Sequence, residues 1–204
     1  LMLEWYRSQA RYEDIMQDVQ ELIQSLSTQK ILVQKKTVSQ VFKELAGFDV
    51  LEYLDKNKFH TFIKEKFPHL PLFESMPSWD DYFFLVFLNE IEPKLKTYPA
   101  LILYEYPHYQ AALSTIKESD PRVCERFELY LNGVEIANCF NEATDLTELK
   151  MRFQDQAKQK IDEHGYQLPE PSEFYQTMNE YPKSAGIALG VERLYAALTQ
   201  DDLF

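Results

Sequence analysis

The stretch RFELYLNGVEIANCFNE, residues 126–142, decides the fold class of this chain. Its two halves, residues 126–131 and 134–140, are rich in aromatic and apolar side chains and flank the dipeptide Asn132-Gly133. Asn-Gly favours a two-residue type I′ turn, which joins two antiparallel strands. The sequence therefore predicts a β-hairpin at this position, within an antiparallel sheet.

The predicted hairpin brings two carboxylates onto one face of the sheet. With a two-residue loop, Tyr130 pairs with Glu135, and Glu128 lies on the same face as Glu135, one diagonal position away. Two such carboxylates repel each other unless a cation lies between them. Mg²⁺ carried by a nucleotide supplies that charge, because it commonly takes one or two protein carboxylates besides phosphate oxygens. The alternative, two carboxylates that are merely solvated, stays open.

Helices alternate with strands along the rest of the chain. From Ile15 to Leu26 the apolar residues recur at helical spacing, which predicts an amphipathic helix over about residues 10–27. Further helices are expected at residues 38–46, 50–54, 59–66, 78–91, 146–163, 173–180 and 191–199, and further strands at residues 1–7, 99–106 and 186–189. Strands paired by a hairpin and interleaved with helices indicate an α+β fold.

Composition excludes several classes of protein. The chain of 204 residues has 33 acidic and 21 basic side chains, a formal net charge of −12, which argues against a general binder of nucleic acids or anionic membranes. The longest apolar run, residues 82–88, is far shorter than the ~20 residues of a membrane-spanning helix. Two cysteines make neither a disulfide framework nor a zinc site. We expect a soluble, cytoplasmic protein without a membrane partner.

An amide and a carboxylate follow the hairpin at Asn138 and Glu142. This combination suits an ammonium group, which needs hydrogen-bond acceptors placed around a point charge. Cys139 lies between them in the sequence, in acidic surroundings that would raise the pKa of its thiol. Because acidic residues are plentiful in this chain, the grouping alone does not decide between a binding site and a solvated surface.

The sequence GIALGVER, residues 186–193, forms a third group of interest. Gly186, Ala188 and Gly190 occupy one face of the predicted strand, which lets a flat or bulky group approach its backbone. Arg193 follows in the first turn of a helix, where a guanidinium and the helix N-terminus both favour phosphate. The alternative is tight packing of strand and helix, with Arg193 in a structural ion pair.

Taken in order, these segments resemble class II lysyl-tRNA synthetases. The resemblance rests on Leu3-Glu4-Trp5-Tyr6, Arg126-Phe127-Glu128, Glu135-Ile136-Ala137-Asn138, Phe140-x-Glu142 and residues 186–193. It is greatest to the short paralogues that attach a lysine-type amino acid to a lysine of elongation factor P. It implies the antiparallel sheet of that family, flanked by helices. It also implies that residues 1–204 are the C-terminal part of the catalytic domain, lacking its N-terminal part.

The resemblance also implies internal boundaries and residue roles. The second strand of motif 2 falls at residues 1–7, a helical insertion at about 10–95, the active-site hairpin at 126–142 and motif 3 at 186–198. Lysine is expected to contact Glu4, Tyr6, Asn138 and Glu142. Mg²⁺ is expected on Glu128 and Glu135, and ATP on Glu135, Ile136, Gly190 and Arg193, with Arg193 also the catalytic arginine.

The implied function is ATP- and Mg²⁺-dependent activation of lysine or β-lysine as an adenylate, followed by ligation to elongation factor P. Ala188 and the acidic charge weigh against the alternative, a catalytic-domain fragment of a lysyl-tRNA synthetase, so tRNA is not expected as a partner. A non-catalytic, synthetase-derived binding protein is the other alternative. In the family, the segment before Leu1 carries the dimer-forming motif 1 and the motif 2 arginine. We therefore expect the full-length protein to be a homodimer and residues 1–204 alone to be inactive.

Cys139 departs from the family pattern, because bacterial relatives usually have glycine at this position. A cysteine there would be strained if the backbone required a positive φ angle.

Overall fold

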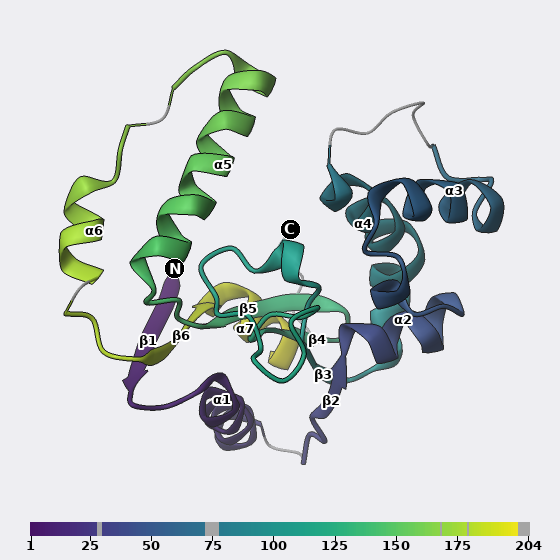
Figure 1. Ribbon diagram of the computed structural model, residues 1–204. Coiled ribbons are helices and arrows are strands. Elements are labelled where there is room, and N and C mark those ends of the chain that lie inside the picture. The colour runs from purple at the N-terminus through teal and green to yellow at the C-terminus, as the bar shows by residue number, and fades with distance from the viewer. Residues whose placement is uncertain (28–29, 72–77, 168, 179, 200–204) are drawn as a thin grey trace.

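The computed structural model describes residues 1–27, 30–71, 78–167, 169–178 and 180–199. Its centre is a sheet of six strands in the order β1-β6-β5-β4-β3-β2 (Figure 1). The strands are β1 (Met2–Ser8), β2 (Gln34–Thr37), β3 (Ala100–Tyr104), β4 (Arg126–Leu131), β5 (Val134–Asn141) and β6 (Ser184–Gly190). The predicted α+β fold is confirmed, and so is the hairpin of β4 and β5.

The turn between β4 and β5 has the predicted geometry. Asn132 and Gly133 have φ angles of 51° and 84°, and a type I′ turn requires positive φ at both central residues. A Cβ atom added at Gly133 would lie 2.9 Å from the backbone nitrogen of Lys96. Glycine is therefore required here both by the backbone conformation and by the close approach of a neighbouring segment.

The sheet is antiparallel, as predicted, except at one edge. Residues 34–37 form β2, which pairs in parallel with β3, whereas all other neighbouring strands are antiparallel. The sequence QKKT of β2 contains no apolar residue, so it lacks the alternation that marks a half-buried strand. Its place in the sheet comes from pairing with the buried strand β3.

The helices agree with the predicted ones except near residues 50 and 90. They are α1 (Tyr12–Leu26), α2 (Val38–Ala46), α3 (Lys56–Lys66), α4 (Trp79–Val86), α5 (Leu146–His164), α6 (Ser172–Met178) and α7 (Val191–Thr199). One α-helix is predicted at residues 78–91, but α4 ends at Val86. A π-helical turn, η2 (Phe87–Ile91), and a 3₁₀ segment, η3 (Glu92–Thr97), follow it. The helix predicted at residues 50–54 is a 3₁₀ turn, η1 (Val50–Glu52). No helix among the described residues is long and apolar enough to cross a membrane.

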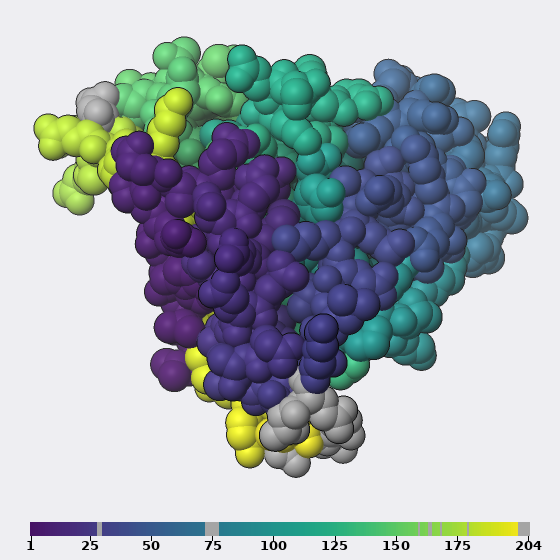
Figure 2. Space-filling view, turned by 90° about the horizontal axis from the view of Figure 1, so that it is seen from below, coloured from purple at the N-terminus to yellow at the C-terminus, as the bar shows by residue number. Residues whose placement is uncertain are grey.

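Two hydrophobic cores lie on opposite faces of the sheet, and β3 divides them. Leu101 and Leu103 pack with the helices from α2 to α4, while Ala100 and Ile102 pack with α1 and α7. Figure 1 shows α2–α4 gathered at the β2–β3 end of the sheet, with α5 and α6 extending from the β5–β6 end. Seen from below, the N-terminal residues, which include α1, occupy much of the near surface (Figure 2). The face shared with Leu103 carries the candidate site.

Candidate functional site

Two rows of paired residues cross the sheet and bring the predicted site residues together. One row runs Leu103, Glu128, Asn138, Ala188, Glu4, from β3 to β1. The next runs Arg126, Phe140, Gly186, Tyr6, from β4 to β1. Directly paired residues of neighbouring strands point to the same face. Residues from four distant segments of the sequence therefore share one surface.

A β-bulge in the hairpin creates this alignment. Leu131 pairs with Val134 and Tyr130 with Glu135, as predicted, but the register then shifts. A regular ladder would place Glu128 opposite Ala137, whereas the structure places it opposite Asn138. The extra residue in β5 re-aims the strand. As a result Asn138 points to the same face as Glu128 and Glu135, although it lies three positions beyond Glu135.

The Glu128 carboxylate is held by three hydrogen-bond donors. Arg126 Nη2 donates to Oε1 at 2.6 Å, while the hydroxyls of Tyr106 and Tyr130 donate to Oε2 at 2.5 and 2.6 Å. Burial and then the charge of Glu128 raise the pKa of both tyrosines, which remain protonated donors. Oε1 keeps a lone pair for a further partner.

Glu135 is more open and lies next to Arg193. Burial, followed by the charge of Glu128, raises the pKa of Glu135 above its ordinary value. Arg193 Nη1 donates to the backbone oxygen of Glu135 at 3.0 Å and lies 4.0 Å from its Oε2. The guanidinium is still more than half exposed, so this contact leaves it accessible to an anion.

The bare face of β6 is covered by larger side chains from its two neighbours. A Cβ atom added at Gly186 would lie 2.2 Å from Cε1 of Tyr6 and 2.9 Å from Oε1 of Glu142. Glycine is therefore required here for the approach of Tyr6 and Glu142. Gly190 is different, because its added Cβ would meet only Arg193 side-chain atoms at 3.5 Å or more.

Glu142 is a half-buried carboxylate, and none of the described residues forms a salt bridge with it. Burial raises the pKa of Glu142 to about 7. Its neighbours include Tyr6 and Tyr181, whose own pKa values are raised by burial and then by the Glu142 charge. A buried anion without a cation is costly. Glu142 therefore has the environment of a group that receives its cation from a ligand.

Cys139 does not belong to this group. Its side chain is buried on the opposite face, in the core with α1 and α7. Burial, and to a lesser extent Glu142, raises the pKa of its thiol, in the predicted direction. Its φ angle is not positive, so the strain anticipated for a non-glycine residue does not arise. Cys124 is also buried, and neither cysteine is in a disulfide.

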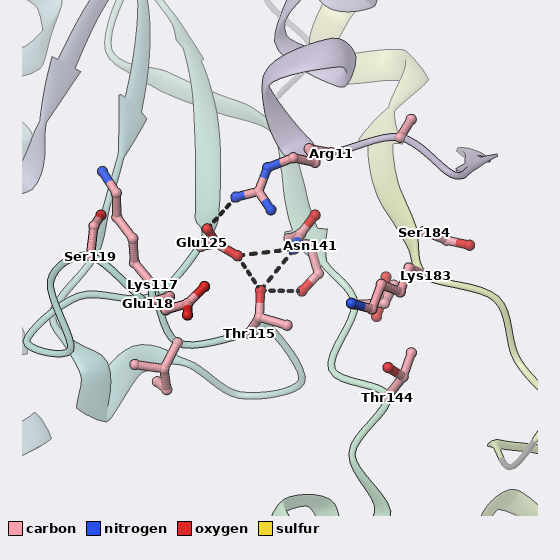
Figure 3. A pocket seen from close by; sticks show the side chains of 13 residues that line it. Arg11, Thr115, Lys117, Glu118, Ser119, Glu125, Asn141, Thr144, Lys183 and Ser184 are labelled. Carbon is pink, nitrogen blue, oxygen red and sulfur yellow. Dashed lines mark hydrogen bonds and ion pairs between the residues drawn. The ribbon is translucent and has the colours of Figure 1, made fainter.

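A polar cavity of about 680 Å³ borders Glu142, and the sequence analysis did not anticipate it. Figure 3 shows its central network, in which Thr115 and Asn141 both donate to Glu125 Oε2, at 2.6 and 3.0 Å. Arg11, at the start of α1, pairs with the other oxygen of Glu125. The carboxylate of Glu125 is thus satisfied by the chain itself.

Arg126 is the main residue of the site that the sequence analysis left without a role. It is 8% exposed and contacts Glu128, Asn138 and the backbone oxygen of Gln110. A signal existed in the sequence, since Arg126 is two positions from Glu128 and therefore on the same strand face. Ile136 points the other way, into the core on the α1 side. Among the described residues, no group of three or more His, Cys, Asp or Glu could hold a metal ion.

Comparisons with known proteins show which proteins the chain is similar to. Three curated relatives share the name elongation factor P–(R)-β-lysine ligase. The protein of Proteus mirabilis is 31% identical, over 95% of this chain and 59% of the relative. The protein of Hamiltonella defensa is 32% identical, over 95% of this chain and 59% of the relative. The protein of Pseudoalteromonas translucida is 30% identical, over 98% of this chain and 61% of the relative. The chain spans about three-fifths of the length of these relatives. Residues 1–203 match the family described as tRNA synthetases class II (D, K and N), and the chain belongs to that family.

Proposed function

We propose that this chain forms part or all of a ligase that activates a lysine-type amino acid with ATP and transfers it to a lysine of elongation factor P. The observation that carries the proposal is Glu142, a half-buried carboxylate that has a raised pKa and no salt bridge to any described residue, beside a strand with small side chains on one face. The family match and the names of the relatives support it further.

The amino-acid site is proposed around Glu142. Its carboxylate would accept the side-chain ammonium of the substrate, with the Tyr6 ring packed beside it over Gly186. Glu4 and Asn138 lie one row further along the sheet, on either side of Ala188. A charge-assisted contact in this partly dry environment is stronger than the same contact in water.

The nucleotide site is proposed along the hairpin and the start of α7. Glu128 and Glu135 fit a Mg²⁺ ion, because they share a face of the sheet and because burial, followed by the charge of Glu128, raises the pKa of Glu135. When bound, Mg²⁺ would neutralise charge on the phosphates of ATP. Arg193 would bind a phosphate oxygen. Ile136 and Gly190 would offer only backbone, since the Ile136 side chain is buried on the other face.

The proposed chemistry needs no protein nucleophile. The substrate carboxylate attacks the α-phosphorus of ATP, the bond from that phosphorus to the bridging oxygen breaks, and pyrophosphate leaves. The uncharged amine of the acceptor lysine then attacks the adenylate carbonyl, forming an amide and releasing AMP and a proton. The chain contributes positioning and charge stabilisation, which supply most of the catalysis in such reactions. Arg193 is the proposed catalytic residue, because it would contact the reacting phosphate.

The test uses the complete gene product and ATP in two assays, one with radiolabelled pyrophosphate and unlabelled lysine or (R)-β-lysine, and one with the same amino acids radiolabelled. We expect amino-acid-dependent exchange of pyrophosphate into ATP, and transfer of the label from the amino acid to elongation factor P rather than to tRNA. Aminoacylated tRNA at the rate of a true synthetase would instead favour the lysyl-tRNA synthetase alternative. No exchange with any lysine-type amino acid would favour a non-catalytic role. Sedimentation of the same protein tests the expected homodimer.

A further inference from the structure

Arg126 connects the two halves of the proposed site through a single nitrogen atom. Its Nη2 donates to Oε1 of Glu128 at 2.6 Å and to Oδ1 of Asn138 at 3.1 Å. Glu128 lies on the proposed metal and nucleotide side, and Asn138 on the proposed amino-acid side. The position of one guanidinium therefore sets the orientation of a group on each side.

The guanidinium itself is fixed from three directions. Its central carbon lies 4.5 Å from the ring centre of Tyr106 and 5.2 Å from that of Phe140, so the plane is held between two aromatic rings. Nη1 donates to the backbone oxygen of Gln110 at 3.1 Å. Gln110 is in turn held by its side chain, which donates to Oδ1 of Asp80 at 2.6 Å.

Asp80 lies in the first turn of α4. A continuous chain of contacts thus runs from the helical segment, through Gln110 at the end of the 3₁₀ turn η4 (His108–Gln110), to Arg126 and the two site residues. The Arg126 Nε atom is buried and has no hydrogen-bond partner among the described residues. Nη1 and Nη2, by contrast, both have hydrogen-bond acceptors. The two terminal nitrogens of the guanidinium therefore make all of its hydrogen bonds to described residues.

We propose that Arg126 is a positioning residue that holds Glu128 and Asn138 in their working orientations and so couples the metal–nucleotide side of the site to the amino-acid side. This inference rests on the proposed function. A guanidinium can hold Gln110, Glu128 and Asn138 together because its nitrogens form a rigid fork. A lysine at this position would keep the positive charge but offer a single nitrogen.

The first test compares Arg126→Lys with the unchanged complete gene product in pyrophosphate exchange. Removing partners that orient metal ligands typically costs 10–100-fold in metal affinity or activity, so we expect kcat/KM to fall about 10–100-fold. The fall should have two components, a higher Mg²⁺ concentration for half-maximal rate and a higher KM for the amino acid. Tyr130→Phe, which removes one donor to Glu128 and leaves Asn138 untouched, should shift the Mg²⁺ dependence alone.

Arg122→Lys is the matched control, because Arg122 is an exposed arginine paired with Asp120 in the preceding loop. It should leave both parameters within about twofold, as expected for an exposed ion pair. Gln110→Leu removes the hydrogen bond to Asp80. It should raise the Mg²⁺ requirement and the KM for the amino acid, as Arg126→Lys does, but by less. If Arg126→Lys fails to fold, Gln110→Leu carries the test.

A crystal structure of Arg126→Lys without substrate separates this inference from the proposed function. We expect the side chains of Glu128 and Asn138 to adopt new orientations while the strands stay in register. If the unchanged protein shows no exchange, the proposed function fails and this structure still decides the positioning role. Unaltered Glu128 and Asn138, or a variant that loses thermal stability while both KM and the Mg²⁺ dependence stay unchanged, would overturn the inference.

Discussion

Glu125 and Glu142 border the same cavity, but only Glu125 has its charge neutralised by another residue of the described chain. Glu125 is 6% exposed and is paired with Arg11, Thr115 and Asn141. Glu142 is half-buried, no described residue forms a salt bridge with it, and burial raises its pKa to about 7. A buried carboxylate satisfied from within stabilises the fold, whereas one left without a cation indicates a place for a charged ligand.

The largest expected effect comes from neutralising the carboxylate that lacks a cation. Glu142→Gln should lower lysine-dependent pyrophosphate exchange about 30–1,000-fold, since losing a charge-assisted contact costs roughly 2–4 kcal/mol. ATP binding, measured by calorimetry in the complete gene product, should stay nearly unchanged. Thermal stability should not fall, because the empty protein gains nothing from a lone buried charge. Equal exchange rates for the variant and the unchanged protein would remove Glu142 from the site.

The pH dependence should follow the raised pKa of Glu142. Because the pKa of Glu142 is raised to about 7, the empty folded protein binds a proton more tightly there than the unfolded chain does. This carboxyl should lower the stability as pH rises from about 4.5 to 7, and the effect ends once the folded form has titrated. A cationic substrate requires the ionised form, so kcat/KM for the amino acid should rise up to tenfold per pH unit below 7 and level off above it. In Glu142→Gln, kcat/KM should no longer rise with pH below 7. If the rise persists in the variant, the titration belongs to another group.

The smallest effect on substrate use should come from Glu125. In Glu125→Gln, an amide replaces the carboxylate that accepts hydrogen bonds from Thr115 and Asn141. This change should lower the free energy of unfolding by about 1–3 kcal/mol. The KM for the amino acid should change less than twofold. Arg11→Gln is the companion variant, and because the Arg11 side chain is 56% exposed, we expect it to cost less than Glu125→Gln. Urea denaturation measures both. A large change in KM with unaltered stability would mean that the two carboxylates do not divide their roles.

Local signals in the sequence predicted most of the fold. Asn132-Gly133 predicted the turn, and helical spacing predicted α1, whose buried residues include Ile15, Val19 and Ile23. β2 was missed because a short polar edge strand takes its conformation from its partner and carries no periodicity of its own.

The candidate site was predicted less completely. The shared face of Glu128 and Glu135 followed from the turn, but the bulge could not be read from propensity, and it decides where Asn138 points. Arg126 was quoted as part of a motif and left without a role, because its contacts with Gln110 and Tyr106 join segments that are distant in sequence. The motif boundaries and the residue roles stay predictions.

The bulge at Ile136 also changes the sequence spacing of the residues that share one face of β5. Glu135, Asn138 and Glu142 stand at positions i, i+3 and i+7, the spacing that marks one face of a helix. In the structure they lie on β5 and its extension, and one inserted residue turns the helical spacing into a shared strand face. A pattern search built on strict alternation would separate Glu135 from the other two. Deleting the codon for Ile136 would remove the bulge and leave the three residues at strict strand alternation, all still on one face of the sheet, so the face can be kept while the sequence spacing changes.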